Sequence, residues 1–184
     1  ELKQELEEMG VEIIWIEVEG SQSKKIKQIL EKVQTELFVC TQDDVIFDQN
    51  ALKEIIRSFQ ADSSVTMVGV NTMPLPPVTF FEFAMASMLR MNNRIGRHWN
   101  GGSNYLMAGG RCLAFRTSFY KKGRIIDHVV NGDMFFYLEN KALGGVFAHA
   151  KNATIFIRCP QHLRDQVRPS SRYQYSEEEL REYF

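Results

Sequence analysis

The sequence predicts a single α/β domain whose mostly parallel sheet is flanked by helices. Segments rich in Ile and Val alternate with segments whose apolar residues recur at i, i+3, i+4 and i+7, a pattern typical of βαβ units. The composition of the 184 residues, 44% hydrophobic and 24% charged, is that of an ordinary globular protein. Three widely spaced cysteines without a C-x-x-C pair argue against a disulfide framework and against a zinc site. We therefore expect the protein to reside in a reducing compartment.

The first 71 residues carry the alternation of strands and helices. Leu37–Thr41 is a short apolar run of the kind that is buried on both faces of a parallel sheet. Gly10 is suited to end the first helix, and Ser23 to cap the second. The predicted elements are a helix over Glu1–Met9, a strand over Val11–Val18, a helix containing Ile26–Val33, a strand over Leu37–Thr41, a helix over Asn50–Gln60 and a strand over Val65–Asn71.

After residue 71 the pattern is broken by Pro74, Pro76 and Pro77. A glycine pair, Gly109-Gly110, interrupts one predicted strand, which indicates a bulge or the close approach of another group to the backbone. The predicted elements are a helix over Val78–Arg94, a turn at Asn100–Gly102, a strand over Tyr105–Phe115, a helix over Asp133–Leu143, strands over Val146–His149 and Thr154–Arg158, and a helix start at Ser176.

Charge is unevenly distributed along the chain, although the formal net charge is −1. Residues 1–62 hold fourteen acidic and seven basic residues, whereas the stretch between Glu82 and Asp127 has eight basic residues and no acid. This basic segment either attracts an anionic partner or forms a solvated face that pairs with the acidic first third. Its basic residues are Arg90, Arg94, Arg97, Arg111, Arg116, Lys121, Lys122 and Arg124.

Two neighbouring carboxylates, Asp43 and Asp44, follow the predicted strand Leu37–Thr41 directly. Ligands bind outside the carboxyl ends of strands in open α/β sheets. Adjacent carboxylates repel each other unless a positive charge is near, and Mg²⁺ or Mn²⁺ held by them and by substrate phosphates is a common solution. The alternative is that the aspartates begin a turn and that Asp48 or Asn50 caps the next helix.

Four motifs in order resemble those of family 2 glycosyltransferases. They are Gly20–Leu52 with its glycine, lysine and acidic D-x-D-type motif, Asn104–Thr117 (NYLMAGGRCLAFRT), the helix start Asn131-Gly132-Asp133, and the region from Gln166-Val167-Arg168 to Arg172-Tyr173. The resemblance implies a GT-A-like fold that lacks its N-terminal strands, so that residues 1–184 are one catalytic domain of a larger chain. Three departures are Gln42 in place of an acid, Gly132 in place of Glu and Tyr173 in place of Trp.

The resemblance implies a metal-dependent, inverting glycosyltransferase. Such an enzyme moves a sugar from a nucleotide-sugar donor to a glycan or lipid-linked acceptor, and no nucleic-acid partner is expected. Asp44 matches the aspartate that ligates the Mg²⁺ or Mn²⁺ on the donor diphosphate, and Asp43 matches the neighbour that contacts metal or donor sugar. Asp133 matches the catalytic base.

The resemblance also implies further binding residues on both sides of the site. On the donor side, Gln166 with either Arg168 or Arg172 matches the group that binds the pyrophosphate or the acceptor, and the spacing leaves both arginines open. On the acceptor side, the matching strand contains Gly109, Gly110 and Arg111.

Elementary chemistry is compatible with these roles and with structural alternatives. A base must take the proton of the acceptor hydroxyl, and a positive environment must stabilise the departing diphosphate. Asp133 at a helix start suits the first task, but it is equally suited to be an N-cap. Arg164, Arg168 and Arg172 would share one helix face, yet Pro169 favours a loop that binds phosphate.

The alternative function is a non-catalytic module that docks through a basic surface on an anionic membrane or protein partner. In Phe80–Trp99, apolar residues precede Arg90, Arg94 and Arg97, as in an interfacial helix, although the phenylalanines could instead be buried under the sheet. We expect the arginines to face solvent. With no apolar run of membrane-spanning length, we expect a cytoplasmic protein that contacts the membrane surface peripherally.

Overall fold

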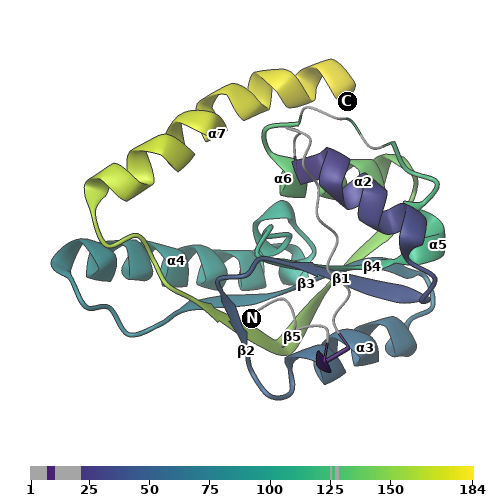
Figure 1. The fold of residues 1–184 in the computed structure, drawn as a ribbon, viewed down its shortest axis with the longest axis horizontal. Helices are drawn as coiled ribbons and strands as arrows, with labels where there is room; N and C mark the ends of the chain where they lie inside the picture. The colour runs from purple at the N-terminus through teal and green to yellow at the C-terminus, as the bar shows by residue number, and fades with distance from the viewer. Residues whose placement is uncertain (1–7, 11–21, 125, 127–128) are drawn as a thin grey trace.

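A computed structural model describes residues 8–10, 22–124, 126 and 129–184, so the helix predicted over Glu1–Met9 lies mostly, and the strand over Val11–Val18 entirely, outside the described residues. The centre is a five-stranded sheet in the order β1-β4-β3-β5-β2 (Figure 1). The strands are β1 (Leu37–Thr41), β2 (Val45–Phe47), β3 (Val65–Pro74), β4 (Cys112–Arg116) and β5 (Val146–Ile157). The helices are α2 (Gln22–Lys32), α3 (Ala51–Ala61), α4 (Phe80–His98), α5 (Thr117–Tyr120), α6 (Gly132–Ala142) and α7 (Leu163–Tyr183), with short 3-10 turns η1 (Trp99–Gly102) and η2 (Tyr105–Met107).

The predicted mostly parallel, GT-A-like sheet is wrong. Three of the four strand pairings in the described sheet are antiparallel, and β3 with β5 is the parallel pair. β4 lies between β1 and β3 and is antiparallel to both. The alternation of strands and helices predicted the order of elements along the chain, but it carries no information on which later strand inserts between two earlier ones.

The sheet is strongly curled. Its two edge strands, β1 and β2, are joined by residues 42–44 alone. Four steps of chain reach at most about 14 Å, whereas the edges of a flat five-stranded sheet lie about 19 Å apart. As an edge strand, β1 is partly exposed along its length, so its predicted burial on both faces is also wrong.

Two hydrophobic cores cover the two faces of the sheet, because side chains alternate between faces along each strand. Met67 of β3 and Phe115 of β4 belong to the larger core, which α2, α6 and α7 complete. Val68 and Ala114, their neighbours in sequence, belong to the second core under α3. Figure 1 shows α3 on one side of the sheet, with α2, α6 and α7 on the other.

The chain from Val146 to Ile157 is one bulged strand, β5, rather than the two predicted strands. Val70 pairs with Ala150 and Asn71 with Thr154, so residues 151–153 bulge out of the ladder. The side-chain nitrogen of Asn71 donates to the carbonyl oxygens of Lys151 (2.7 Å) and Ala153 (3.0 Å) and so satisfies backbone acceptors in the bulge.

Two further predictions fail for local reasons. The expected strand Tyr105–Phe115 divides into the turn η2 and the strand β4, with the glycine pair in the connection between them. Near the C-terminus, the expected loop at Pro169 and the expected helix start at Ser176 both lie inside α7. A proline removes one backbone hydrogen bond, and a helix of 21 residues continues through that loss. No helix in the described part of the chain is long and apolar enough to cross a bilayer.

Candidate functional site

A cavity of about 720 Å³ lies on the face of the sheet that carries the larger core. Strands β1, β3 and β4 form its floor. Its walls come from α4, η2, the turn before β4, the first turn of α6, and the α7 residues Ser176 and Leu180. Segments far apart in sequence therefore meet at one concave surface, which is the usual setting of a binding site.

Asp133 lines this cavity from the first turn of α6. The cap of α6 is Asn131, whose side chain accepts a hydrogen bond from the backbone N–H of Met134, so the N-cap alternative for Asp133 is wrong. The Oδ2 atom of Asp133 accepts a hydrogen bond from the backbone N–H of Gly110 at 3.0 Å. Burial raises the pKa of Asp133, against smaller opposing effects of backbone hydrogen bonds and the charge of Arg111. A carboxylate with a raised pKa is a stronger base than an exposed one.

The glycine pair has one constrained member and one free member. A Cβ atom at Gly110 would lie 2.9 Å from Cγ of Asp133, so the backbone approaches this carboxyl more closely than other residues allow. A Cβ atom at Gly109 would meet nothing within 4 Å. The predicted close approach is therefore confirmed at Gly110, and the group that approaches is Asp133.

Arg111 connects Asp133 to the acidic turn after β1. Its Nη1 donates to Oε1 of Gln42 and to Oδ2 of Asp44, at 2.5 Å in each case. Its carbonyl oxygen accepts from the hydroxyl of Thr41 at 3.0 Å, which holds the start of β4 against the end of β1. Arg111 thus pairs with Asp44 and also lines the cavity that Asp133 lines.

Asp43 and Asp44 form the exposed turn between β1 and β2, and neither lines the cavity itself. The described residues contain no group of three or more His, Cys, Asp or Glu side chains that could hold a metal. Two neighbouring carboxylates suit a Mg²⁺ or Mn²⁺ ion whose other ligands are substrate phosphates and water. Asp44 and Asp43 would hold such an ion, and the ion would neutralise charge on a diphosphate.

Of the residues near the C-terminus that were predicted to bind the donor, the structure describes the side chain of Gln166. Gln166 lies near the start of α7 and does not line the cavity. Arg168 and Arg172 lie in α7, but their side chains are outside the described part of the structure. The choice between these two arginines stays open.

Asn93 is a cavity residue that sequence analysis missed. Its Nδ2 donates to the carbonyl oxygen of Thr72 at 3.1 Å, whereas its buried Oδ1 has no partner among the described residues. A buried acceptor without a donor at a cavity wall suits a hydroxyl group of a ligand. The sequence feature that could have identified Asn93 is a polar residue on the same helix face as the small residues Ala86 and Gly96, which are buried.

We expect Asp133→Asn to stabilise the fold at neutral pH. Because burial raises the pKa of Asp133, the folded state favours the protonated carboxyl, and ionisation costs stability as pH rises through the folded pKa. The variant carries no charge, so its free energy of unfolding should exceed that of the parent at pH 7. The gain should vanish below the ordinary aspartate pKa of 3.8. Urea unfolding at both pH values measures it, and a variant that is less stable by the same amount at both would contradict the expectation.

Comparisons with protein-family models and with curated proteins found no relative of this chain: no model of a protein family matches it, and no curated protein matches it.

Proposed function

We propose that the protein is a glycosyltransferase that moves a sugar from a nucleotide-sugar donor to a hydroxyl of a glycan or lipid-linked acceptor, with inversion. The observation that carries the proposal is the meeting of a partly buried carboxylate, Asp133, and a guanidinium, Arg111, at one cavity of about 720 Å³. The motifs shared with family 2 glycosyltransferases support the same activity. The proposal does not depend on the prediction of a mostly parallel sheet, which was wrong.

Asp133 is the base in this proposal. As the acceptor hydroxyl oxygen attacks the anomeric carbon, Oδ1 or Oδ2 of Asp133 takes its proton, and the bond from the anomeric carbon to the diphosphate oxygen breaks. The electron pair leaves with the diphosphate. The Gly110 N–H holds Oδ2 in place, and burial keeps the carboxylate basic.

Arg111 stabilises the leaving group in this proposal. Its guanidinium is planar, permanently charged and suited to phosphate oxygens. Asp44 and Gln42 orient it in the absence of substrate. Asp44 and Asp43 would hold a Mg²⁺ or Mn²⁺ ion that comes with the donor, and the ion would supply positive charge for the diphosphate. Asn93 Oδ1 offers an acceptor for a sugar hydroxyl.

We expect Asp44→Asn to remove the Mn²⁺-dependent part of nucleoside diphosphate binding. The amide keeps the shape of the side chain, but it is a much weaker ligand for a divalent cation. Melting temperatures are measured with UDP or GDP, with and without Mn²⁺, because a ligand that binds only the folded state at 100 times its dissociation constant stabilises it by about 2.7 kcal/mol.

The matched control is Glu31→Gln, which neutralises an exposed carboxylate on α2. The parent and the control should show the same increase in melting temperature with nucleotide plus Mn²⁺. An Asp44→Asn variant that responds like the parent would refute the metal role. A parent that responds to none of the nucleotides, in the longest natural chain that contains these residues, would refute the proposed function.

A further inference from the structure

A second cavity, of about 550 Å³, lies between α4 and the bulge of β5, and every charged side chain that lines it is basic. The bulge held by Asn71 brings Lys151 to this cavity, opposite the C-terminal half of α4. We call it the basic cavity. The basic residues that line it are Arg90, Arg94, Arg97, His98 and Lys151.

Six of the eight residues of the basic segment fall into two groups in the structure, and Lys151 of β5 joins the second group. Arg111, Arg116 and Arg124 pair with Asp44, Glu36 and Glu139. Arg90, Arg94, Arg97 and Lys151 form no ion pair with the residues that the structure describes. Arg111 and Arg116 pair with acids of the first third, as the solvated-face alternative expected, whereas Arg124 pairs with Glu139 of α6. The basic cavity retains positive charge that no ion pair among the described residues compensates.

A half-buried histidine, His149, lies beside this cavity. His149 lies next to the bulge, and its Nε2 is 3.1 Å from Oδ1 of Asn71. Burial first, and then the charges of Arg97 and Lys151, lower the pKa of His149 to about 4. His149 is therefore neutral at pH 7 and adds no charge of its own.

The outer side of α4 is apolar as well as basic. Its core side carries Glu82, Ala86, Asn93 and Gly96, all buried. Away from the core, four apolar residues are exposed, from 45% to 87%, although a helix in water normally shows polar residues there. We call them the exposed apolar row, which consists of Phe80, Met88, Met91 and Ile95. The last three follow each other at spacings of three and four residues, and the first lies eight residues before them.

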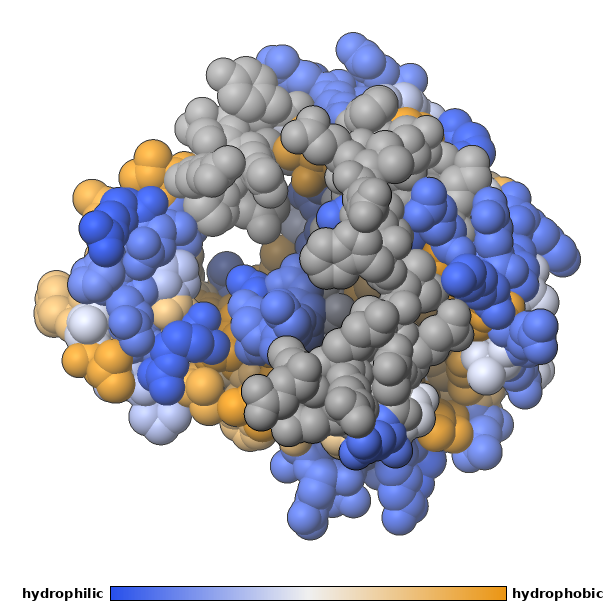
Figure 2. Space-filling view, viewed as in Figure 1, coloured by the Kyte–Doolittle hydropathy of each residue, from blue (hydrophilic) through white to orange (hydrophobic). Residues whose placement is uncertain are grey.

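Further exposed apolar residues extend this row at both ends. Trp99, at the end of α4, is 48% exposed and packs edge-on against Tyr105. At the other end, the hydroxyl of Thr79 donates to the carbonyl oxygen of Gln161, which brings exposed Leu163 near the start of α4. Figure 2 shows hydrophobic residues beside hydrophilic ones at the end of the molecule where α4 and α7 begin.

We propose that α4 docks on an anionic lipid surface, with head-group phosphates in the basic cavity and the exposed apolar row among the acyl chains. A soluble anion accounts for the arginines alone, and an apolar protein partner accounts for the exposed row alone. An anionic bilayer presents both chemistries in adjacent layers, and a helix with an apolar row beside basic residues, ended by a tryptophan, suits that boundary. This proposal stands whether or not the proposed function is correct.

The test is co-sedimentation with vesicles of phosphatidylcholine, with and without phosphatidylserine. The parent should bind the phosphatidylserine vesicles and release them at high salt, because exposed charges are screened there. The triple variant R90Q/R94Q/R97Q should bind on the order of 100-fold more weakly. The control K53Q/R57Q/K122Q loses the same charge from exposed positions outside the basic cavity and should lose far less.

A second variant tests the apolar half of the surface. M88S/M91S/I95S changes exposed side chains, so the melting temperature should stay close to that of the parent while vesicle binding falls. Equal binding to both kinds of vesicle, or an equal loss in the charge control, would overturn the proposal. Undiminished vesicle binding by M88S/M91S/I95S would also overturn it, since the apolar row would then take no part in docking. Binding of soluble inositol phosphates without binding of vesicles would overturn it as well, since that result points to a soluble phosphorylated ligand.

Discussion

Transfer catalysed by Asp133→Asn should be slower than that of the parent by two to four orders of magnitude, the usual contribution of a positioned general base. The amide fills the same space beside Gly110 and still offers an oxygen to its N–H, but it cannot take the proton of the acceptor hydroxyl. Affinity for the nucleoside diphosphate should be unchanged, because Asp133 acts on the acceptor. Single-turnover measurements give the transfer rate, and binding of the nucleoside diphosphate gives the donor-side affinity. Both are measured with the longest natural chain that contains these residues.

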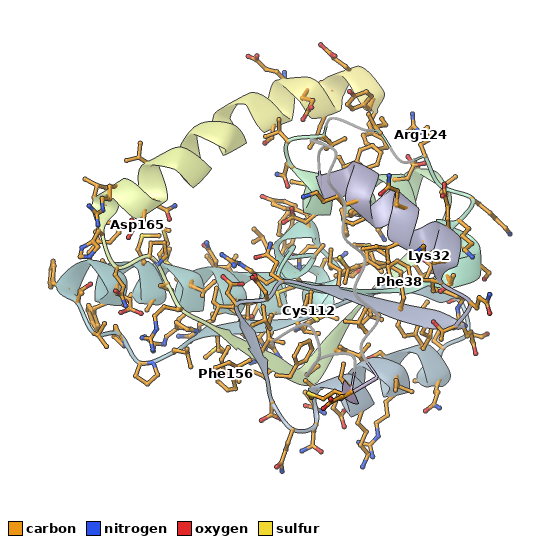
Figure 3. The ribbon with its side chains drawn as sticks, in the orientation of Figure 1. Lys32, Phe38, Cys112, Arg124, Phe156 and Asp165 are labelled. Atoms are coloured by element: carbon orange, nitrogen blue, oxygen red, sulfur yellow. The ribbon has the colours of Figure 1, made fainter. Side chains whose placement is uncertain are left out.

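Asp165→Asn is the matched control for this experiment. Asp165 lies in the first turn of α7, as Asp133 lies in the first turn of α6, so both substitutions remove a charge favoured by the helix dipole. Figure 3 shows Asp165 at the end of α7 opposite to the end near Arg124. The control should transfer at the parental rate. Comparable loss in both variants would indicate a structural effect and would contradict the role of Asp133 as the base.

Gly69→Ala should destabilise the fold by about 3 kcal/mol, the upper part of the range for overpacked cores. A Cβ atom at Gly69 would lie 2.0 Å from the carbonyl oxygen of Met107 and 2.8 Å from Cζ of Phe147. A backbone carbonyl cannot rotate away as a side chain can, so η2 must move off β3. For a chain of this length the melting temperature should fall by about 6–12 °C, measurable by circular dichroism.

Gly109→Ala is the control for this substitution, because a Cβ atom there would meet nothing within 4 Å. Its melting temperature should stay within about 2 °C of the parent, as expected of a substitution without a new contact. If Gly69→Ala were as stable as Gly109→Ala, the close packing of η2 on β3 would be wrong. Because η2 also forms a wall of the larger cavity, the destabilised variant should lose ligand affinity as well.

The candidate site was predictable where the chemistry is local. Asp133 in the first turn of a helix and Asp44 after a strand were identified from residue type and position, and the constraint at Gly110 from the glycine pair. The contacts that join them were not predictable. Arg111 was assigned to the acceptor side on resemblance, yet its guanidinium contacts Gln42 and Asp44, about seventy residues earlier.

The surface of α4 illustrates the same division between what the sequence shows and what the fold decides. The absence of acids in the basic segment was visible in the sequence, and the arginines on α4 are exposed as expected. Which of its basic residues are paired was not visible, because the partners Glu36 and Glu139 come from distant segments. Whether the phenylalanines of α4 are buried under the sheet was also not visible in the sequence. In the fold, Phe80 and Phe83 are exposed.

The sequence by itself determined the type and approximate place of most described elements, because a helix is built from contacts between residues three or four apart and its apolar period reports them directly. It did not determine which apolar residues are buried. Leu52 and Ile56 belong to the apolar pattern of α3, yet they are exposed. Only the tertiary structure decided the strand order, the strand directions and the convergence of the site, because pairing such as Cys40 with Leu113 joins residues whose separation leaves no periodic trace in the sequence.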